Sequence, residues 1–212
     1  MSRNRVVFCD FDGTITREET FVAMLKEFAP ELSAKLIPEM YALRLTLREG
    51  VREILESIPS NKYQDIINFS RTKAIRPGLS TLLDFLHTEG VPFVVVSGGL
   101  KGMVENVLGD LVKKVEKIYA VDLDLSGIYC QVKSPMESET ELVDKVKIMS
   151  LYPTDQSIAI GDSVTDLNMG MKADLVFARD RLANYLDERQ KPYIFWDDFD
   201  QIRDHLQKLW QI

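Results

Sequence analysis

The feature that most constrains the fold is a series of short apolar runs that end in polar residues. The first run, VVFC at 6–9, leads into Asp10 and Asp12, and later runs end in SGG at 97–99 and GDSVTD at 161–166. Apolar runs of this length without alternation are typical of strands buried on both faces of a parallel sheet. Because such strands present ligand sites at their carboxyl ends, we expect these polar residues to share one crevice.

Helical patterns separate the apolar runs. Apolar residues recur at three- and four-residue spacing in segments such as 79–89, 102–115 and 197–210, and a hairpin is expected within 117–133. Strands that alternate with helices in this way predict an α/β fold with a doubly wound parallel-sheet, Rossmann-like core.

The segment after the first strand has a different pattern. From residue 18 to about 70 it reads as amphipathic helices, which prolines and glycines break into several short ones. We therefore predict a helical cap at 17–75, inserted into a core that is built from 1–16 and 76–212.

Composition limits the partners and the compartment. The 212 residues include 33 acidic and 26 basic side chains, a formal charge of −7, which argues against nucleic acid as a partner. No apolar signal segment or run of about 20 apolar residues is present, so no membrane association is expected. Two cysteines far apart in sequence favour a reducing cytoplasm over a disulfide scaffold. The sequence leaves monomer and homodimer open.

The acidic residues at the strand ends predict a metal site and a nucleophile. Carboxylates gathered in one crevice repel one another unless a hard cation such as Mg²⁺ holds them. A carboxylate beside such a cation can attack phosphorus, and a second carboxylate can protonate the leaving oxygen. A turn or a helix cap would explain either Asp10 or Asp12 alone, but not the matching acids of GDSVTD.

The other motifs supply donors for a phosphate. Ser97, Gly98 and Gly99 offer a hydroxyl and backbone N–H groups where the chain turns towards a helix. Lys145 is expected to stabilise the transferring group electrostatically. Lys147 competes for this role, and a solvated helix lysine is the ordinary interpretation of either side chain.

Four motifs in order carry a family resemblance. DFDGTIT at 10–16, VVVSGG at 94–99, a lysine at a helix start and GDSVTD at 161–166 resemble the motifs of the haloacid-dehalogenase-like phosphohydrolases. The resemblance implies Asp10 as nucleophile, Asp12 as general acid and base, and a small phosphorylated metabolite as substrate. It implies that Mg²⁺ is bound by the Asp10 carboxylate, the Asp12 carbonyl and Asp162, with Asp166 as a ligand through water or an orienting group. The implied contacts of the phosphoryl group are Thr14, Ser97, Gly98 and Lys145.

The position of the cap resembles the phosphoserine-phosphatase-like subgroup, and stretches of core, cap and last helix resemble its methionine-salvage phosphatases. A phosphorylated salvage intermediate is therefore the expected substrate. Segment 131–144 stands where a cysteine-rich insert is expected, which leaves the register of the lysine open. Glu19 matches a glutamate that binds the substrate amine in phosphoserine phosphatases, or it caps a helix, so phosphoserine stays an alternative.

Other interpretations stay open. Arg179 either binds a substrate anion or pairs with a nearby acid, and pairing is favoured. A small-sugar or cofactor phosphatase would share the chemistry. A receiver-like phospho-acceptor would also gather aspartates and Mg²⁺, but it needs neither a cap nor the acid at Asp12. A non-catalytic phosphate-binding protein is disfavoured, because no motif position is lost.

Overall fold

A seven-stranded sheet forms the centre of the molecule in the computed structural model, which describes residues 4–211. The strand order is β4-β3-β2-β1-β5-β6-β7, and β4 alone runs antiparallel to its neighbour. The strands are β1 (Arg5–Cys9), β2 (Phe93–Leu100), β3 (Lys117–Asp124), β4 (Gln131–Lys133), β5 (Gln156–Gly161), β6 (Leu175–Ala178) and β7 (Ile194–Phe195). This mostly parallel sheet confirms the predicted α/β class.

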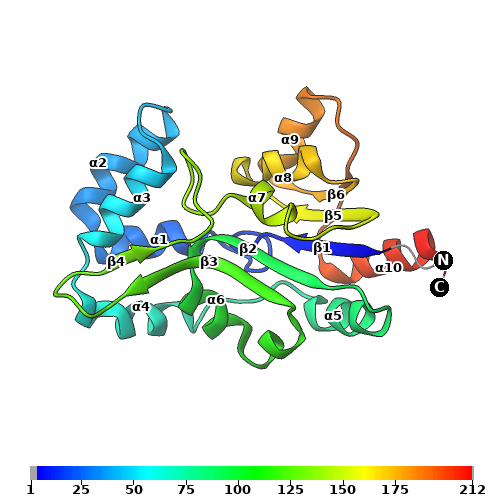
Figure 1. The fold of residues 1–212 in the computed structure, drawn as a ribbon, viewed down its shortest axis with the longest axis horizontal. Helices are drawn as coiled ribbons and strands as arrows, with labels where there is room; N and C mark the ends of the chain where they lie inside the picture. The colour runs from blue at the N-terminus through cyan, green and yellow to red at the C-terminus, as the bar shows by residue number, and fades with distance from the viewer. Residues whose placement is uncertain (1–3, 212) are drawn as a thin grey trace.

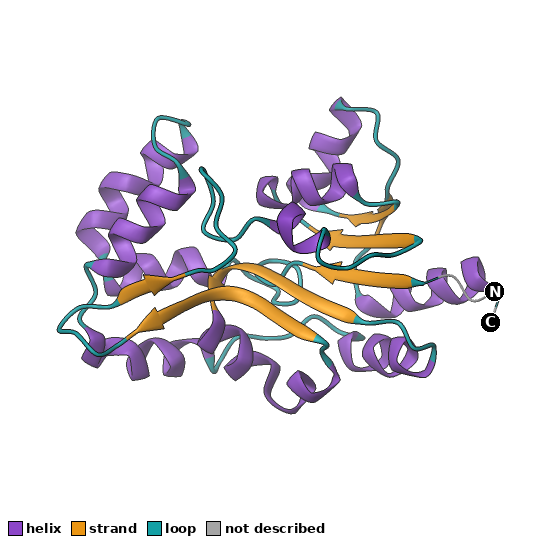
Figure 2. Cartoon of the chain, in the orientation of Figure 1, coloured by secondary structure: helices purple, strands orange, loops and turns teal. Residues whose placement is uncertain are grey.

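Helices cover both faces of the sheet (Figures 1 and 2). One face packs against α5 (Leu79–Thr88), α6 (Lys101–Leu108) and α10 (Phe199–Trp210). The other packs against α7 (Lys145–Met149), α8 (Leu167–Lys172) and α9 (Asp180–Glu188). Side chains of β1 alternate between the two layers, because Val6 and Phe8 join one apolar cluster and Val7 and Cys9 join the other. Burial on both faces explains why this strand is a continuous apolar run.

The helical insertion leaves the sheet region at Thr16 and returns at Ile75, where these two residues form an antiparallel bridge. It contains α1 (Thr20–Phe28), α2 (Pro30–Tyr41), α3 (Leu47–Glu56), the 3-10 turn Ser60–Lys62 and α4 (Tyr63–Ser70). Figure 1 places α1, α2 and α3 beyond the carboxyl end of β1, whereas α4 lies along α6. The first three helices are therefore the ones that can cover the strand ends.

The β3–β4 hairpin joins the insertion to the core. The backbone N–H of Cys130 donates to the Ile58 carbonyl, and the Val132 N–H donates to the Glu56 carboxylate. Residues 134–144 form the loop that connects β4 to α7 and leads directly into Lys145. In space this loop lies between α3 and α7 (yellow-green in Figure 1). Among the described residues, no helix is both long and apolar enough to cross a membrane.

Candidate active site

The turn after β1 is held rigidly at the carboxyl edge of the sheet. Gly13 has a φ of +83°, and a Cβ there would lie 2.5 Å from an Asp162 carboxylate oxygen, so a side chain fits neither the backbone nor the space. The Arg76 guanidinium donates to the carbonyls of Gly13 (2.7 Å) and Thr14 (3.0 Å). Asp10 and Asp12 are thereby presented from a fixed loop.

Three carboxylates meet at this edge. Oxygens of Asp10, Asp162 and Asp166 lie within 4.8 Å of one another. The Lys145 ammonium donates to Asp10 Oδ1 at 2.5 Å and to Asp166 Oδ1 at 2.6 Å. Lys145 is 3% exposed at the start of α7, while Lys147 is exposed and its ammonium donates to the Glu137 carbonyl at 3.4 Å. The structure thus brings Lys145, rather than Lys147, to the predicted site.

Asp166 orients the strand end. Its Oδ2 accepts hydrogen bonds from the backbone N–H groups of Asp162 and Ser163, both at 3.0 Å, while its Oδ1 faces Lys145. The short GDSVTD turn therefore closes on itself through the last aspartate. Both oxygens of Asp166 are therefore engaged within the protein, while the residue remains within the carboxylate group that could hold a cation.

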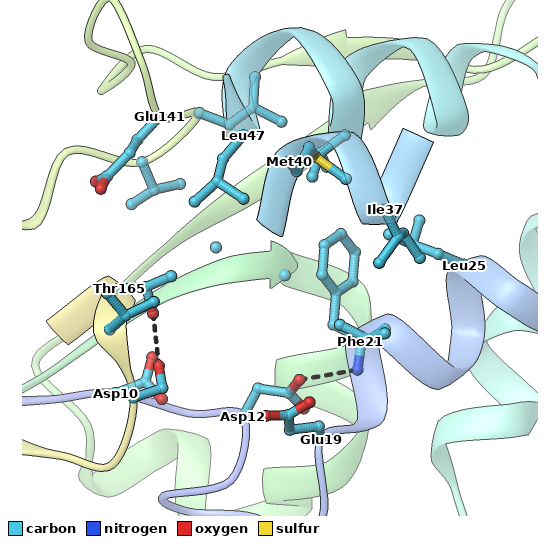
Figure 3. A pocket seen from close by; sticks show the side chains of 18 of the residues that line it. Asp10, Asp12, Glu19, Phe21, Leu25, Ile37, Met40, Leu47, Glu141 and Thr165 are labelled. Carbon is cyan, nitrogen blue, oxygen red and sulfur yellow. Dashed lines mark hydrogen bonds between the residues drawn. The ribbon is translucent and has the colours of Figure 1, made fainter. Parts of the chain in front are cut away.

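Asp12 lies at the amino end of α1. Its carboxylate accepts hydrogen bonds from the Thr20 N–H at 2.5 Å and from the Thr20 hydroxyl. It also accepts the Phe21 N–H at 3.0 Å, the contact drawn in Figure 3. Burial raises the pKa of Asp12, although these hydrogen bonds oppose the rise. The carboxylate next to the candidate nucleophile therefore also caps the first helix of the insertion.

The acidic cluster, formed by Asp10, Asp162 and Asp166, has an excess of negative charge that a bound cation would compensate. Burial raises the pKa of Asp10 well above its ordinary value, and the Asp166 charge adds to the rise. Burial and Asp166 also raise the pKa of Asp162 to about 7. Lys145 stays protonated because Asp10 and Asp166 outweigh the effect of its burial and raise its pKa. One ammonium among three buried carboxylates leaves negative charge uncompensated, and a set of carboxylate oxygens suits a hard divalent cation.

The predicted phosphate contacts are only partly at the cavity. Gly98 and Gly99 line it, and the Ser97 hydroxyl accepts the Gly99 N–H at 3.0 Å just behind. These residues lie in an irregular end of β2, and α6 begins at Lys101, so the glycines are not part of a helix start. Thr14 is buried, and its hydroxyl donates to Asp162 at 2.7 Å rather than facing the cavity.

Two arginines follow β6, and the structure brings the second one to the cavity. Arg179 pairs with Asp180 at 2.8 Å and donates to the Asp197 carbonyl, so it does not line the cavity, in agreement with the pairing interpretation. Arg181 does line it, and its guanidinium donates to Glu19 at 3.1 Å. Glu19 precedes α1 without capping it by its side chain. The predicted amine-binding glutamate is thus already paired.

A cavity of about 180 Å³ opens above the acidic cluster (Figure 3). The insertion gives it an apolar wall, and the loop before α7 adds further apolar side chains. The wall residues from α1, α2 and α3 are Phe21, Val22, Leu25, Ile37, Met40, Tyr41, Leu47 and Val51, and Leu142 and Val143 come from the loop. The cavity therefore has charged side chains at the ends of the strands and apolar side chains from the insertion and the loop opposite them.

Comparison with known proteins identifies the family. The model of the haloacid dehalogenase-like hydrolases matches residues 7–171. A 2-hydroxy-3-keto-5-methylthiopentenyl-1-phosphate phosphatase of Microcystis aeruginosa (strain NIES-843 / IAM M-2473) is 57% identical over 205 residues, 96% of this chain and 98% of that protein. The chain belongs to the haloacid dehalogenase-like hydrolases. Another phosphatase of the same name, from Bacillus cytotoxicus, is 35% identical and covers 97% of each chain. A substrate-bound phosphoserine phosphatase structure shares the fold of this hydrolase, with a TM-score of 0.70 at 20% identity over 97% of this chain and 99% of that one.

Sequence reasoning missed several residues that line the cavity of this hydrolase. Arg181 stands two positions after Arg179, and a basic residue in the first turn of a predicted helix was the only signal. Glu141 lies in a loop without a pattern, four positions before Lys145, and the sequence carries no signal for it. Ser163 and Thr165 lie inside the GDSVTD motif, where the aspartates alone were considered.

In the absence of divalent cations, we expect the free energy of unfolding of the hydrolase to fall as the pH rises. The raised pKa of Asp162, about 7 against an ordinary 3.8, means that the folded chain holds this proton more tightly than the unfolded chain. The free energy of unfolding should therefore fall between about pH 4 and pH 7 when a chelator is present. Urea unfolding at about pH 5 and pH 8 measures this, and the predicted Mg²⁺ should restore stability at the higher pH. Asp162→Asn should make the dependence shallower without abolishing it, because burial also raises the pKa of Asp10, Asp12 and Glu141. A stability that rises over this interval without metal would contradict the prediction.

Proposed function

We propose that this hydrolase is a Mg²⁺-dependent phosphomonoesterase that removes phosphate from 2-hydroxy-3-keto-5-methylthiopentenyl-1-phosphate in methionine salvage. The observation that carries the proposal is the 57% identity over 96% of the chain to a phosphatase of that name. The buried acidic cluster below the cavity supports the same chemistry. Two free, buried cysteines fit the cytoplasmic location that we also propose.

Asp10 is the nucleophile in this proposal. Its carboxylate attacks phosphorus, the bond between phosphorus and the ester oxygen breaks, and Asp12 gives a proton to the leaving oxygen. Water then attacks the aspartyl phosphate, Asp12 takes the proton from that water, and the bond between Asp10 and phosphorus breaks to release inorganic phosphate. The raised pKa of Asp12 suits a group that must first donate a proton.

The remaining charged groups support transfer. Mg²⁺ would be held by the carboxylates of Asp10 and Asp162 and the Asp12 carbonyl, where it supplies positive charge to the phosphoryl oxygens. Lys145 holds the Asp10 carboxylate in place and adds a second positive charge. Gly98 and Gly99 offer backbone N–H groups at the cavity, and Ser97 supports that turn.

We assign residues 17–75 as the cap, and its cavity wall fits the apolar end of the proposed substrate. Met40, Leu47 and Val51 come from α2 and α3, the helices of the wall farthest from β1 in Figure 3. A methylthio group is apolar and polarizable, and it packs favourably against such side chains. The wall also excludes bulk water from the aspartyl phosphate.

Phosphoserine is the second candidate, because the cavity rim carries Glu19 and Arg181 of opposite charge. A zwitterionic amino acid could bind them only after their 3.1 Å ion pair separates. The partners are 44% and 57% exposed, so this pair is worth little in stability and does not by itself forbid such binding. The substrate must therefore be decided by measurement.

Phosphate release from a substrate panel tests the function. We expect kcat/KM to be highest for the methylthiopentenyl phosphate, and about 100-fold or more lower for phosphoserine, because the apolar wall gives a charged amino acid no compensation and Glu19 and Arg181 would first have to separate from each other. A chelator should stop release from every compound. Preference for phosphoserine would overturn the substrate but keep the mechanism. A stable phosphoprotein without turnover would indicate a receiver-like phospho-acceptor instead.

A further inference from the structure

We propose that Glu141 determines substrate specificity: its carboxylate accepts a hydrogen bond from a hydroxyl group on the carbon next to the phosphoester carbon. The proposal rests on the proposed function, because it requires a phosphoester in the cavity above Asp10. It concerns a different part of the substrate from the reacting phosphorus.

Glu141 is carried into the cavity by the loop between β4 and α7. It lines the cavity four residues before Lys145, and Figure 3 shows it on the opposite side from Asp12 and Glu19. The loop continues through Leu142 and Val143, which also line the cavity. Glu141 is therefore the polar residue in an otherwise apolar part of the wall.

The backbone of the loop is held at Glu141 itself. The Glu141 N–H donates to the Ser138 hydroxyl at 3.1 Å, and its carbonyl accepts the Ser138 N–H at 2.9 Å. The Arg48 N–H of α3 donates to the carbonyl of Thr140 at 2.8 Å. These contacts fix both sides of the residue, so its side chain starts from a rigid backbone.

A second set of contacts ties the same loop to the insertion. Glu137 accepts from Arg48 at 2.7 Å and from Arg52 at 2.8 Å, and both arginines belong to α3. The loop that carries Glu141 is thus clamped to the helix that supplies Leu47 and Val51 to the cavity wall. The polar group and the apolar wall are positioned by one unit.

The carboxylate of Glu141 has no protein partner. No residue in the described range 4–211 donates a hydrogen bond to it or forms an ion pair with it. Burial raises its pKa, against the opposing effect of Lys145 and with smaller contributions from Asp144 and Asp166. The side chain is partly exposed to the cavity, so its carboxylate is available to a ligand group that supplies a hydrogen-bond donor.

Apart from the exposed Tyr41, the other charged and hydroxyl side chains that line the cavity already have protein partners. Arg181 and Glu19 bind each other, and the hydroxyls of Ser163 and Thr165 lie 2.9 Å apart. Asp10, Asp12 and Lys145 are engaged in the contacts of the acidic cluster and of α1. Among the charged lining residues that the structure describes, Glu141 is the one left to meet a polar group of the ligand.

The chemistry of a carboxylate selects the group it meets. An ionised carboxylate accepts hydrogen bonds only, so it binds a hydroxyl and repels a keto oxygen. Figure 3 shows Glu141 on the same side of the cavity as Asp10, and its loop leads into Lys145, which contacts Asp10, so Glu141 lies towards the phosphate end of the cavity. The 2-hydroxyl of the proposed substrate stands on the carbon next to C1, which bears the phosphate, and an enolic hydroxyl is a strong donor to an anion.

The test compares two esters that differ in one hydroxyl. Phosphate release is measured with a 2-hydroxyalkyl phosphate and with the alkyl phosphate of the same chain length, for wild type, Glu141→Gln and Glu139→Gln. Glu139 is an exposed acid in the same loop and serves as the matched control. We expect wild type and Glu139→Gln to prefer the hydroxylated ester, and Glu141→Gln to lower this kcat/KM ratio by about tenfold or more, because a charge-assisted hydrogen bond becomes a neutral one.

The outcomes distinguish a failure of the role proposed for Glu141 from a failure of the proposed phosphatase activity. If wild type releases phosphate from both esters and Glu141→Gln leaves the ratio unchanged or raises it, the role of Glu141 is overturned while the phosphatase activity stands. An equal fall in the ratio for Glu139→Gln would assign the effect to loop charge and also overturn it. If wild type releases no phosphate from any ester, including the proposed substrate, the proposed function itself fails.

Discussion

Asp10→Asn is expected to abolish phosphate release, with kcat lower by at least about 10⁴-fold on every substrate of the panel. The amide cannot attack phosphorus, and the neighbouring carboxylates are engaged elsewhere. Asp12 is bound to α1, Asp162 accepts from the Thr14 hydroxyl, and Asp166 is bound to Lys145 and two backbone N–H groups. Single-turnover measurement with excess enzyme distinguishes lost chemistry from lost binding.

The same variant should fold at least as well as wild type when metal is absent. Burial disfavours the ionised Asp10, as its raised pKa indicates, so a neutral amide removes that cost at pH 8. Lys145 keeps the Asp166 carboxylate as a partner. An unfolding midpoint in chelator equal to or above that of wild type, together with lost turnover, would assign the effect to chemistry. Activity above about 1% of wild type would place the nucleophile elsewhere.

Much of the core could be predicted because its strands are buried on both faces. Val7 and Cys9 pack into one layer and Val6 and Phe8 into the other, so apolar residues had to be continuous. The positions of the acids followed from the same rule, since parallel strands end at one edge. The close approach of Asp10, Asp162 and Asp166 is the structural result of that rule.

The positions of the helices of the insertion, and the loop residues that reach the cavity, could not be predicted from the sequence. Amphipathic spacing in α1 to α4 indicates helices, but it does not say that α4 lies along α6 while the others cover the strand ends. Arg181 and Glu141 reach the cavity through contacts between segments distant in sequence. Thr14 shows a further limit, because its hydroxyl faces Asp162 and not the cavity, a choice of side-chain direction that spacing does not encode.

The two lysines of DKVKIM offer a matched pair of substitutions, which decides the register of the motif lysine. Lys145→Met is expected to lower kcat by about 10²–10³-fold, because the positive charge beside Asp10 is lost. Lys147→Met should stay within about twofold of wild-type activity, since that side chain is exposed and contacts the Glu137 carbonyl at 3.4 Å. The reverse order of effects would make Lys147 the motif lysine.

Stability should distinguish the two variants as well. Lys145 is 3% exposed between two carboxylates, so its removal leaves buried like charges without compensation, and breaking such an arrangement costs about 3–5 kcal/mol. Met has a similar volume, so the loss reflects charge rather than a cavity. The deficit should be largest in chelator at pH 8, where Asp162 is ionised, and Mg²⁺ should reduce it by supplying the missing positive charge. If Mg²⁺ leaves the deficit unchanged, the cation does not bind where these carboxylates meet, and the metal assignment must move to other residues.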